Sequence, residues 1–222
     1  MVRRFLSSIA VFLIVAQAQP PANDVAIPAG VVAAHMVGRM VIGADGAAEL
    51  IGYYPFLEGI EGSPFSSETE ASERTARFTF RSSRFRVSIL RNDPLTHLRA
   101  TPLEPNTAIV LRAYYNSSPS QEFSRLDSFS AGELIGEYQA RGGITTIIPL
   151  TATINTGSFR FVSGSDFKFG EKTYNFGRLA ENITVELKGA PLDFALGYGS
   201  ASIPFGGSAI AGAASAQRTS SY

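Results

Sequence analysis

Apolar and polar residues alternate along most of this chain. A period of two is typical of β-strands that bury one face, and no helical period extends over about ten residues beyond the N-terminal segment. Turn-forming Gly, Pro, Asn, Asp and Ser separate the alternating runs. The pattern predicts strands at residues 36–42, 48–54, 74–81, 84–91, 107–115, 133–140, 145–155, 159–162, 183–187 and 194–212.

Two tight hairpins are predicted from their turn residues. Asp45-Gly46 separates the first two strands, and Asp-Gly between apolar runs is a strong hairpin signal. Gly170-Glu171 lies between two short aromatic runs, and glycine at the first turn position suits a type II′ turn. Both pairs therefore predict antiparallel neighbours in the sheet.

A third hairpin is predicted around Ser82-Ser83, because the strands on either side alternate cleanly. With these serines as the turn, Phe80 would lie opposite Phe85 and the two apolar faces would coincide. Ser-Ser is not a favoured two-residue turn, so a longer loop with the same pairing is the alternative.

The strand pattern predicts a single all-β domain with little helix. About ten short strands with regular turn signals are typical of an antiparallel β-sandwich or a closed β-barrel of about 8–10 strands. The domain is expected over residues 31–212, between a flexible leader at 19–30 and a flexible tail at 213–222. The acidic, serine-rich stretch 58–73 is expected to form an exposed loop.

The N-terminus resembles a secretory signal. Arg3-Arg4 is a basic head, residues 5–15 are apolar except for two serines, and Ala16-Gln17-Ala18 fits a signal-peptidase site. A spanning helix needs about 20 apolar residues, so this run is too short to be one. We therefore expect residues 1–18 to be removed, leaving a secreted or periplasmic protein that does not span the membrane.

Composition removes several classes of function. The chain has no Cys and no Trp, with 16 Phe, 8 Tyr and 21 Gly. Disulfide scaffolds, thiol catalysis and cysteine-ligated zinc are thereby excluded. Lys and Arg together number 19, as do Asp and Glu, so nucleic acid is not an expected partner. No motif calls for a cofactor.

Four arginines form the first candidate binding feature. Arg77, Arg81, Arg84 and Arg86 share the outward face of the hairpin predicted around Ser82-Ser83. That hairpin would place Arg81 directly opposite Arg84, and like charges in that position are destabilising. Compensation could come from carboxylates of the 58–73 segment or from an external anion.

Two tyrosine doublets, Tyr53-Tyr54 and Tyr114-Tyr115, form the second candidate feature. Successive strand residues point to opposite faces, so each doublet should place one ring inward and one outward. An outward tyrosine offers an apolar ring with a polar hydroxyl, which suits stacking on a sugar or on a partner's side chain.

Catalysis and metal binding find little support. The chain has two histidines, His35 and His97, and contains no Gly-x-Ser-x-Gly, His-Glu-x-x-His or calcium-loop motif. Glu133 and Glu137, four apart on one strand, would be about 13 Å apart, which is wide for a glycosidase pair. We expect no catalytic or metal site, although a carboxylate pair assembled by the fold stays open.

The leading interpretation is an exported, non-catalytic β-domain that binds a carbohydrate or an extracellular protein at its surface. The alternative is a small barrel with an apolar cavity, acting as a carrier of a small apolar ligand or as a cyclase-like enzyme. Its cavity would be lined by Phe78, Phe80, Phe85, Phe167 and Phe169.

Three further questions stay open at the level of sequence. An outer-membrane barrel fits export and alternation, but the arginine row and the polar tail fit it poorly. Asn116 and Asn182 begin N-glycosylation sequons whose use depends on the host. Oligomeric state is not encoded in any pattern found.

Overall fold

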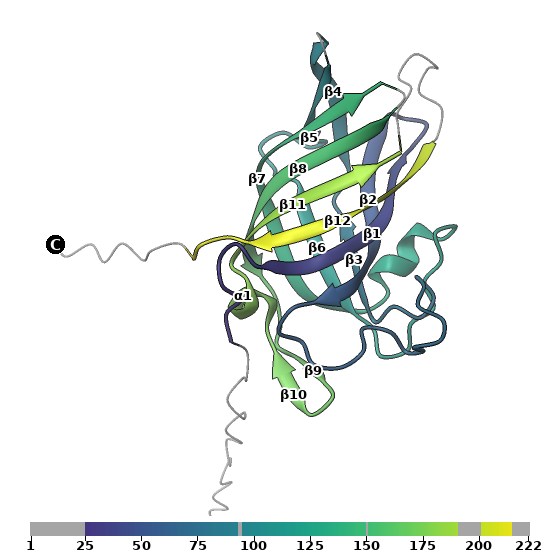
Figure 1. Ribbon diagram of the computed structural model, residues 1–222. Coiled ribbons are helices and arrows are strands. Elements are labelled where there is room, and N and C mark those ends of the chain that lie inside the picture. The colour runs from purple at the N-terminus through teal and green to yellow at the C-terminus, as the bar shows by residue number, and fades with distance from the viewer. Residues whose placement is uncertain (1–24, 93–94, 150, 191–200, 215–222) are drawn as a thin grey trace, which may run out of the picture.

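The protein is an antiparallel β-barrel with almost no helix (Figure 1). The computed structural model describes residues 25–92, 95–149, 151–190 and 201–214. The predicted signal segment 1–18 lies outside the described residues, as do 19–24 of the leader, 194–200 of the last predicted strand and 215–222 of the tail.

The barrel wall is an up-and-down meander in which strands adjacent in the chain are adjacent in space. β1 pairs with both β2 and β12, so the sheet closes on itself with eight strands around the barrel. The wall consists of β1 (Val32–Ile42), β2 (Ala47–Leu57), β3 (Phe78–Ser82), β4 (Phe85–Asn92), β5 (Thr96–Pro102), β6 (Val110–Tyr115), β7 (Glu133–Ile148), β8 (Ala152–Ser163), β11 (Asn182–Gly189) and β12 (Ala201–Ala211).

Two positions in the wall are each filled by a pair of shorter strands. β2 pairs with β3 near one end of the barrel and with β4 near the other. β7 likewise pairs first with β6 and then with β5. β3 and β4 are therefore successive parts of one bent strand, and β5 and β6 are two parts of the next.

The hairpin predicted around Ser82-Ser83 is wrong. Phe80 pairs with Gly52 and Ala113 rather than with Phe85. The serines continue the strand: the Ser82 hydroxyl accepts a hydrogen bond from the Leu50 amide at 2.9 Å, and the Ser83 amide donates to the Val110 carbonyl at 2.8 Å. Serine does not favour the positive φ values of a tight hairpin turn, so nothing local forces a reversal.

The boundary predicted inside residues 133–155 is also wrong. β7 continues through the break expected after residue 140, and the chain turns near Pro149 instead. Proline cannot donate to a strand ladder, which explains why a strand cannot run through this position. The Thr151 amide closes the turn on the Ile148 carbonyl at 3.1 Å.

The other two predicted hairpins are confirmed. Ile42 pairs with Ala48 across the Asp45-Gly46 turn, where Gly46 has φ of 74°. β9 (Phe167–Phe169) pairs with β10 (Lys172–Tyr174) across Gly170, whose φ is 61°. Positive φ is the conformation that makes glycine favourable at such turns.

The β9–β10 hairpin and α1 (Phe176–Leu179) lie across one end of the barrel (Figure 1). Their aromatic rings pack against rings of the wall, for example Phe169 against Phe78 at 5.1 Å between centroids. The Tyr138 hydroxyl is within 3.2 Å of the Phe176 carbonyl and 3.0 Å of the Ala180 carbonyl, which ties α1 to β7. We call this end of the barrel interior the plugged half.

A separate cover lies outside the barrel over β2 and β3. The 3₁₀ helix η1 (Leu126–Ser130) contacts both strands, and Phe129 of η1 and Ile51 of β2 are each fully buried. Thr79 on β3 donates a hydrogen bond to the Phe129 carbonyl at 2.8 Å. Within the described ranges, no helix is both long and apolar enough to cross a membrane.

A candidate binding cavity in the barrel wall

A pocket opens through the wall near the middle of β7. The pairing of β7 with β6 ends at Gln139, and its pairing with β5 begins at Thr145. On the facing side, residues 103–109 connect β5 to β6 outside the ladder. The interruption leaves an opening between the two strand positions, which we call the wall opening.

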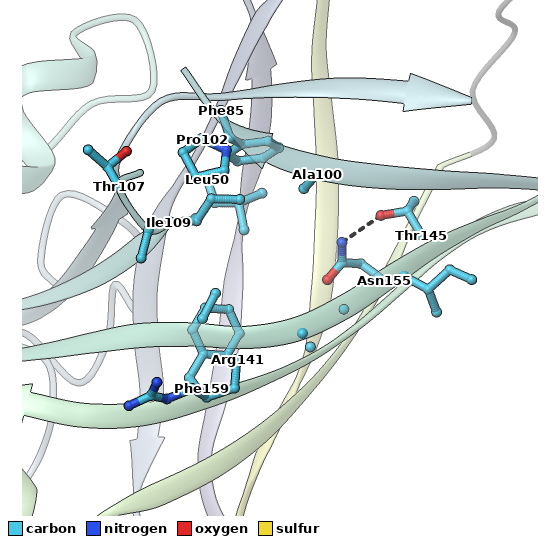
Figure 2. A pocket seen from close by; sticks show the side chains of 16 residues that line it. Leu50, Phe85, Ala100, Pro102, Thr107, Ile109, Arg141, Thr145, Asn155 and Phe159 are labelled. Carbon is cyan, nitrogen blue, oxygen red and sulfur yellow. Dashed lines mark hydrogen bonds between the residues drawn. The ribbon is translucent and has the colours of Figure 1, made fainter. Parts of the chain in front are cut away.

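The cavity behind the wall opening measures about 280 Å³ and is largely apolar (Figure 2). Alternation explains its lining, because side chains two apart on a strand share the inward face. Its apolar side chains come from β2, β4, β5, β7, β8 and the loop before β6: Leu50, Phe85, Ala100, Pro102, Ala108, Ile109, Ala140, Ile144 and Phe159.

Two smaller voids, of about 20 and 30 Å³, adjoin the cavity inside the barrel. Phe205 lines the larger of them, and its ring is stacked near that of Phe80 at 6.2 Å between centroids. Phe80 belongs to the aromatic core of the plugged half. Phe205 belongs to the same buried cluster, so the void borders the edge of the aromatic core. We call the side of the barrel interior with the cavity and the voids the cavity half.

Three neutral polar side chains lie among the apolar ones in the cavity half. Thr145 and Asn155 are cross-strand partners on β7 and β8, and they line the cavity and both smaller voids. The Asn155 amide nitrogen donates to the Thr145 hydroxyl at 2.7 Å (Figure 2). Thr153, two residues earlier on β8, is 5% exposed, and within the part of the chain that the structure describes its hydroxyl finds no hydrogen-bond partner.

Sequence reasoning missed this polar group. The predicted strand 145–155 contains all three residues, but its expected course through Pro149 gave no reason to pair Thr145 with Asn155. One signal could have indicated it: Thr145, Thr153 and Asn155 all occupy odd-numbered positions and so share one strand face, and a buried face is ordinarily apolar.

The five phenylalanines expected to line a cavity do not share one. Phe85 lines the cavity. The other four belong to the packed aromatic core of the plugged half: Phe78, Phe80, Phe167 and Phe169. The expectation is therefore wrong for those four, because the hairpin and helix that close the barrel fill that end with rings.

The tyrosine doublets split between the inner and outer faces, as alternation predicts. Tyr54 and Tyr115 point inward and pack in the plugged half. Tyr53 and Tyr114 are half-buried, and each pairs with Thr79 across neighbouring strands. Burial raises the pKa of both outer tyrosines and, more strongly, that of Tyr54.

Arg81 has two carboxylate partners within the protein. Its guanidinium donates to the buried Glu49 at 2.8 Å and also to Asp127. Burial lowers the pKa of Arg81, but the two carboxylates more than offset this, and the net shift is upward. Its main role in the fold is thus to neutralise Glu49.

The other arginines of the row are spread along the bent strand. Arg84 contacts both carboxylate oxygens of Asp45, at 2.9 and 2.8 Å, and Arg77 donates to the Ser117 carbonyl at 3.3 Å. Hydrogen bonds from the Ala47 amide and from Arg84 lower the pKa of Asp45. Arg86 is exposed. Arg81 and Arg84 do not face each other, so the repulsion expected from a hairpin does not arise.

The remaining candidate groups lie away from the cavity. His97 is 3.1 Å from the hydroxyl of Thr146, whose side chain faces away from the cavity. Glu137 pairs with Arg112 at 2.8 Å. Among the described residues, no cluster of three or more acidic or histidine side chains could hold a metal ion.

Comparison of the chain with models of known protein families, with curated proteins and with solved structures gave no match. The fold and the cavity are therefore the observations from which a function can be inferred.

Proposed function

We propose that this protein is an exported carrier that holds one small, mostly apolar molecule in the cavity half of its barrel. The observation that supports this proposal is the mostly apolar cavity of about 280 Å³, which is reached through the wall opening. Ligand sites are typically concave and mostly apolar, with a few placed polar groups. A barrel of about eight strands is wide enough to hold one small ligand.

The cavity lining suits binding better than catalysis. General acid–base chemistry needs a titratable group within hydrogen-bond reach of the reacting atom. Apart from Arg141, every described side chain that lines the cavity is neutral. Arg141 is exposed, so it lies where the cavity meets solvent. The cyclase-like alternative would have to work by shape alone, and we favour the carrier.

Blocking the cavity tests the proposal. Ala100 lines the cavity on β5, so Ala100→Trp would fill it from the wall opening. Ser88, exposed on β4, provides the control Ser88→Trp on the outer face. The wild type and Ser88→Trp are expected to bind N-phenyl-1-naphthylamine, a neutral fluorescent probe, one to one. Ala100→Trp should lose that binding; equal binding by both variants would refute the carrier proposal.

Export is the second part of this proposal, and it rests on the basic head, apolar run and small-residue site of the first 18 residues. The expected mature protein starts at Gln19. N-terminal sequencing of protein collected from the medium or periplasm checks this. Recovery of the protein only inside cells, with residues 1–18 attached, would contradict it.

We propose surface binding of a carbohydrate or an extracellular protein as a second candidate function, supported by the outward position of Tyr53 and Tyr114. Arg81 is a poor probe of it, because its loss would leave Glu49 buried without a counter-charge. Tyr114→Ala combined with Arg86→Ala should weaken binding on a glycan array. An unchanged glycan profile from a stable double variant would remove this candidate.

A further inference from the structure

An unpartnered hydroxyl lies inside the cavity half. The Thr153 hydroxyl oxygen is buried and has no hydrogen-bond partner among the described residues, although it adjoins a void of about 30 Å³. Leaving a buried polar group unpaired is costly, so an unpaired hydroxyl that borders a void favours a polar partner in that void. If the void held only apolar groups, an apolar side chain would serve at this position as well as threonine.

Asn155 lines both this void and the larger cavity, and it supplies a second polar atom. Its amide nitrogen is held by the Thr145 hydroxyl, which turns its carbonyl oxygen the other way, toward the Phe159 side of the cavity (Figure 2). Asn155 also lines the void next to Thr153. The two side chains together offer a hydroxyl, which can donate or accept, and a carbonyl oxygen, which accepts.

The inner lining carries no charge. The void next to Thr153 is lined by neutral side chains, with Met40, Leu50, Leu187 and Phe205 supplying apolar surface. Burying an ion without a counter-charge is strongly unfavourable. A charged group would therefore stay at the rim near the exposed Arg141, while a neutral polar group can enter.

We propose that Thr153 and Asn155 form a polar anchor, and that the ligand is a neutral, mostly apolar molecule with one hydroxyl or carbonyl oxygen. That oxygen binds where the inner void meets the larger cavity, between Thr153 and Asn155, and the apolar body fills the larger cavity toward the wall opening. Thr145 acts as a positioning residue that orients Asn155. This inference rests on the proposed carrier function and specifies the class of its ligand.

Three probes of one shape test the anchor: naphthalene, 2-naphthol and 2-naphthoate. Their dissociation constants are measured for the wild type and for Asn155→Leu, a change that removes the amide while keeping its approximate size. The wild type should bind 2-naphthol about two- to tenfold more tightly than naphthalene, the range expected for one hydrogen bond. Asn155→Leu should abolish that preference, so that naphthalene and 2-naphthol bind this variant with equal dissociation constants.

Thr153→Val provides a second readout that needs no ligand. The change keeps the shape of the side chain and removes the unpaired hydroxyl, so the unliganded protein should melt about 2–4 °C higher. The same variant should lose part of its preference for 2-naphthol. A lower melting temperature would show that the hydroxyl is already satisfied in the unliganded protein and would overturn its role in the anchor.

The outcomes separate this inference from the carrier function. If none of the three probes and no N-phenyl-1-naphthylamine binds the wild type, the carrier function itself fails. If naphthalene and 2-naphthol bind equally, the carrier function survives and the anchor fails. If 2-naphthoate binds most tightly and Arg141→Ala abolishes that advantage, the ligand is an anion held at the rim, and the proposed class is wrong.

Discussion

β7 and β8 carry two inward-facing cross-strand pairs that differ sharply in chemistry. Near the plug, Tyr138 lies opposite Phe161, with ring centroids 5.4 Å apart and edge-to-face geometry. Toward the other end, Thr145 lies opposite Asn155, and the pair borders open space. The same two strands thus build a dense aromatic core and the wall of a cavity.

The contrast shows that barrel closure alone does not decide whether the interior is solid. Eight strands leave an interior that large side chains can fill, and the plugged half does this with rings from the wall and from β9, β10 and α1. In the cavity half, alanine, glycine and short polar side chains occupy inward positions, and the wall itself is interrupted. Residue size at the inward positions therefore sets the function each half can have.

Truncating one ring in each half is expected to give the largest effect. Phe78 is fully buried among aromatic rings, so Phe78→Ala should cost about 3–5 kcal/mol of unfolding free energy. Phe85→Ala should cost less than about 3 kcal/mol, because the Phe85 ring already borders the cavity. Urea unfolding followed by tyrosine fluorescence measures both. Equal losses would contradict the difference in packing between the halves.

A pair of glycines tests the same contrast with a single added methyl group. A Cβ on Gly52 would lie 2.2 Å from the Val37 carbonyl oxygen and 2.5 Å from the Phe80 ring, whereas a Cβ on Gly142 would meet nothing within 4 Å. Gly52→Ala should therefore lose about 1–3 kcal/mol of stability. Gly142→Ala, at the wall opening, should stay within about 0.5 kcal/mol of the wild type. A stable Gly52→Ala protein would mean that the wall there is looser than described.

Alkaline pH should weaken the plugged half in particular. Burial raises the pKa of Tyr54 and Tyr138 above the usual 10.0. As pH rises above 10, the unfolded chain releases protons that the folded chain keeps, so stability falls. Each tyrosine contributes a slope of about 1.4 kcal/mol per pH unit. Denaturation at several pH values gives the slope of the unfolding free energy against pH, and this slope should be smaller by that amount in Tyr138→Phe. An unchanged slope would place Tyr138 in contact with solvent.

The sequence predicted the class of fold because alternation and turn chemistry are local. Asp45-Gly46 and Gly170 specify their hairpins through positive φ at glycine, and the structure confirms both. Alternation also predicted that each tyrosine doublet would split between the two faces. Sequence patterns could not distinguish a sandwich from a barrel, because closure depends on the pairing of β1 with β12, which are distant in the chain.

The candidate site was largely hidden from sequence reasoning. Ser82 and Ser83 resemble a turn between two matched strands in the sequence. In the structure, hydrogen bonds with the Leu50 amide and the Val110 carbonyl hold them in an extended strand. The buried carboxylate partner of Arg81 is Glu49, on a strand that the predicted hairpin would not place beside Arg81. Contacts between distant segments decided each of these cases, and local propensity carries no information about them.

Native mass spectrometry of the protein purified without detergent tests the central claim most directly. The wild type should carry one additional small, neutral mass that leaves on unfolding, and Ala100→Trp purified in the same way should carry none. The released molecule should be mostly apolar with a hydroxyl or carbonyl oxygen. A bare mass for the wild type and the variant alike would contradict a carrier, and the cavity half would then be a loosely packed part of the core.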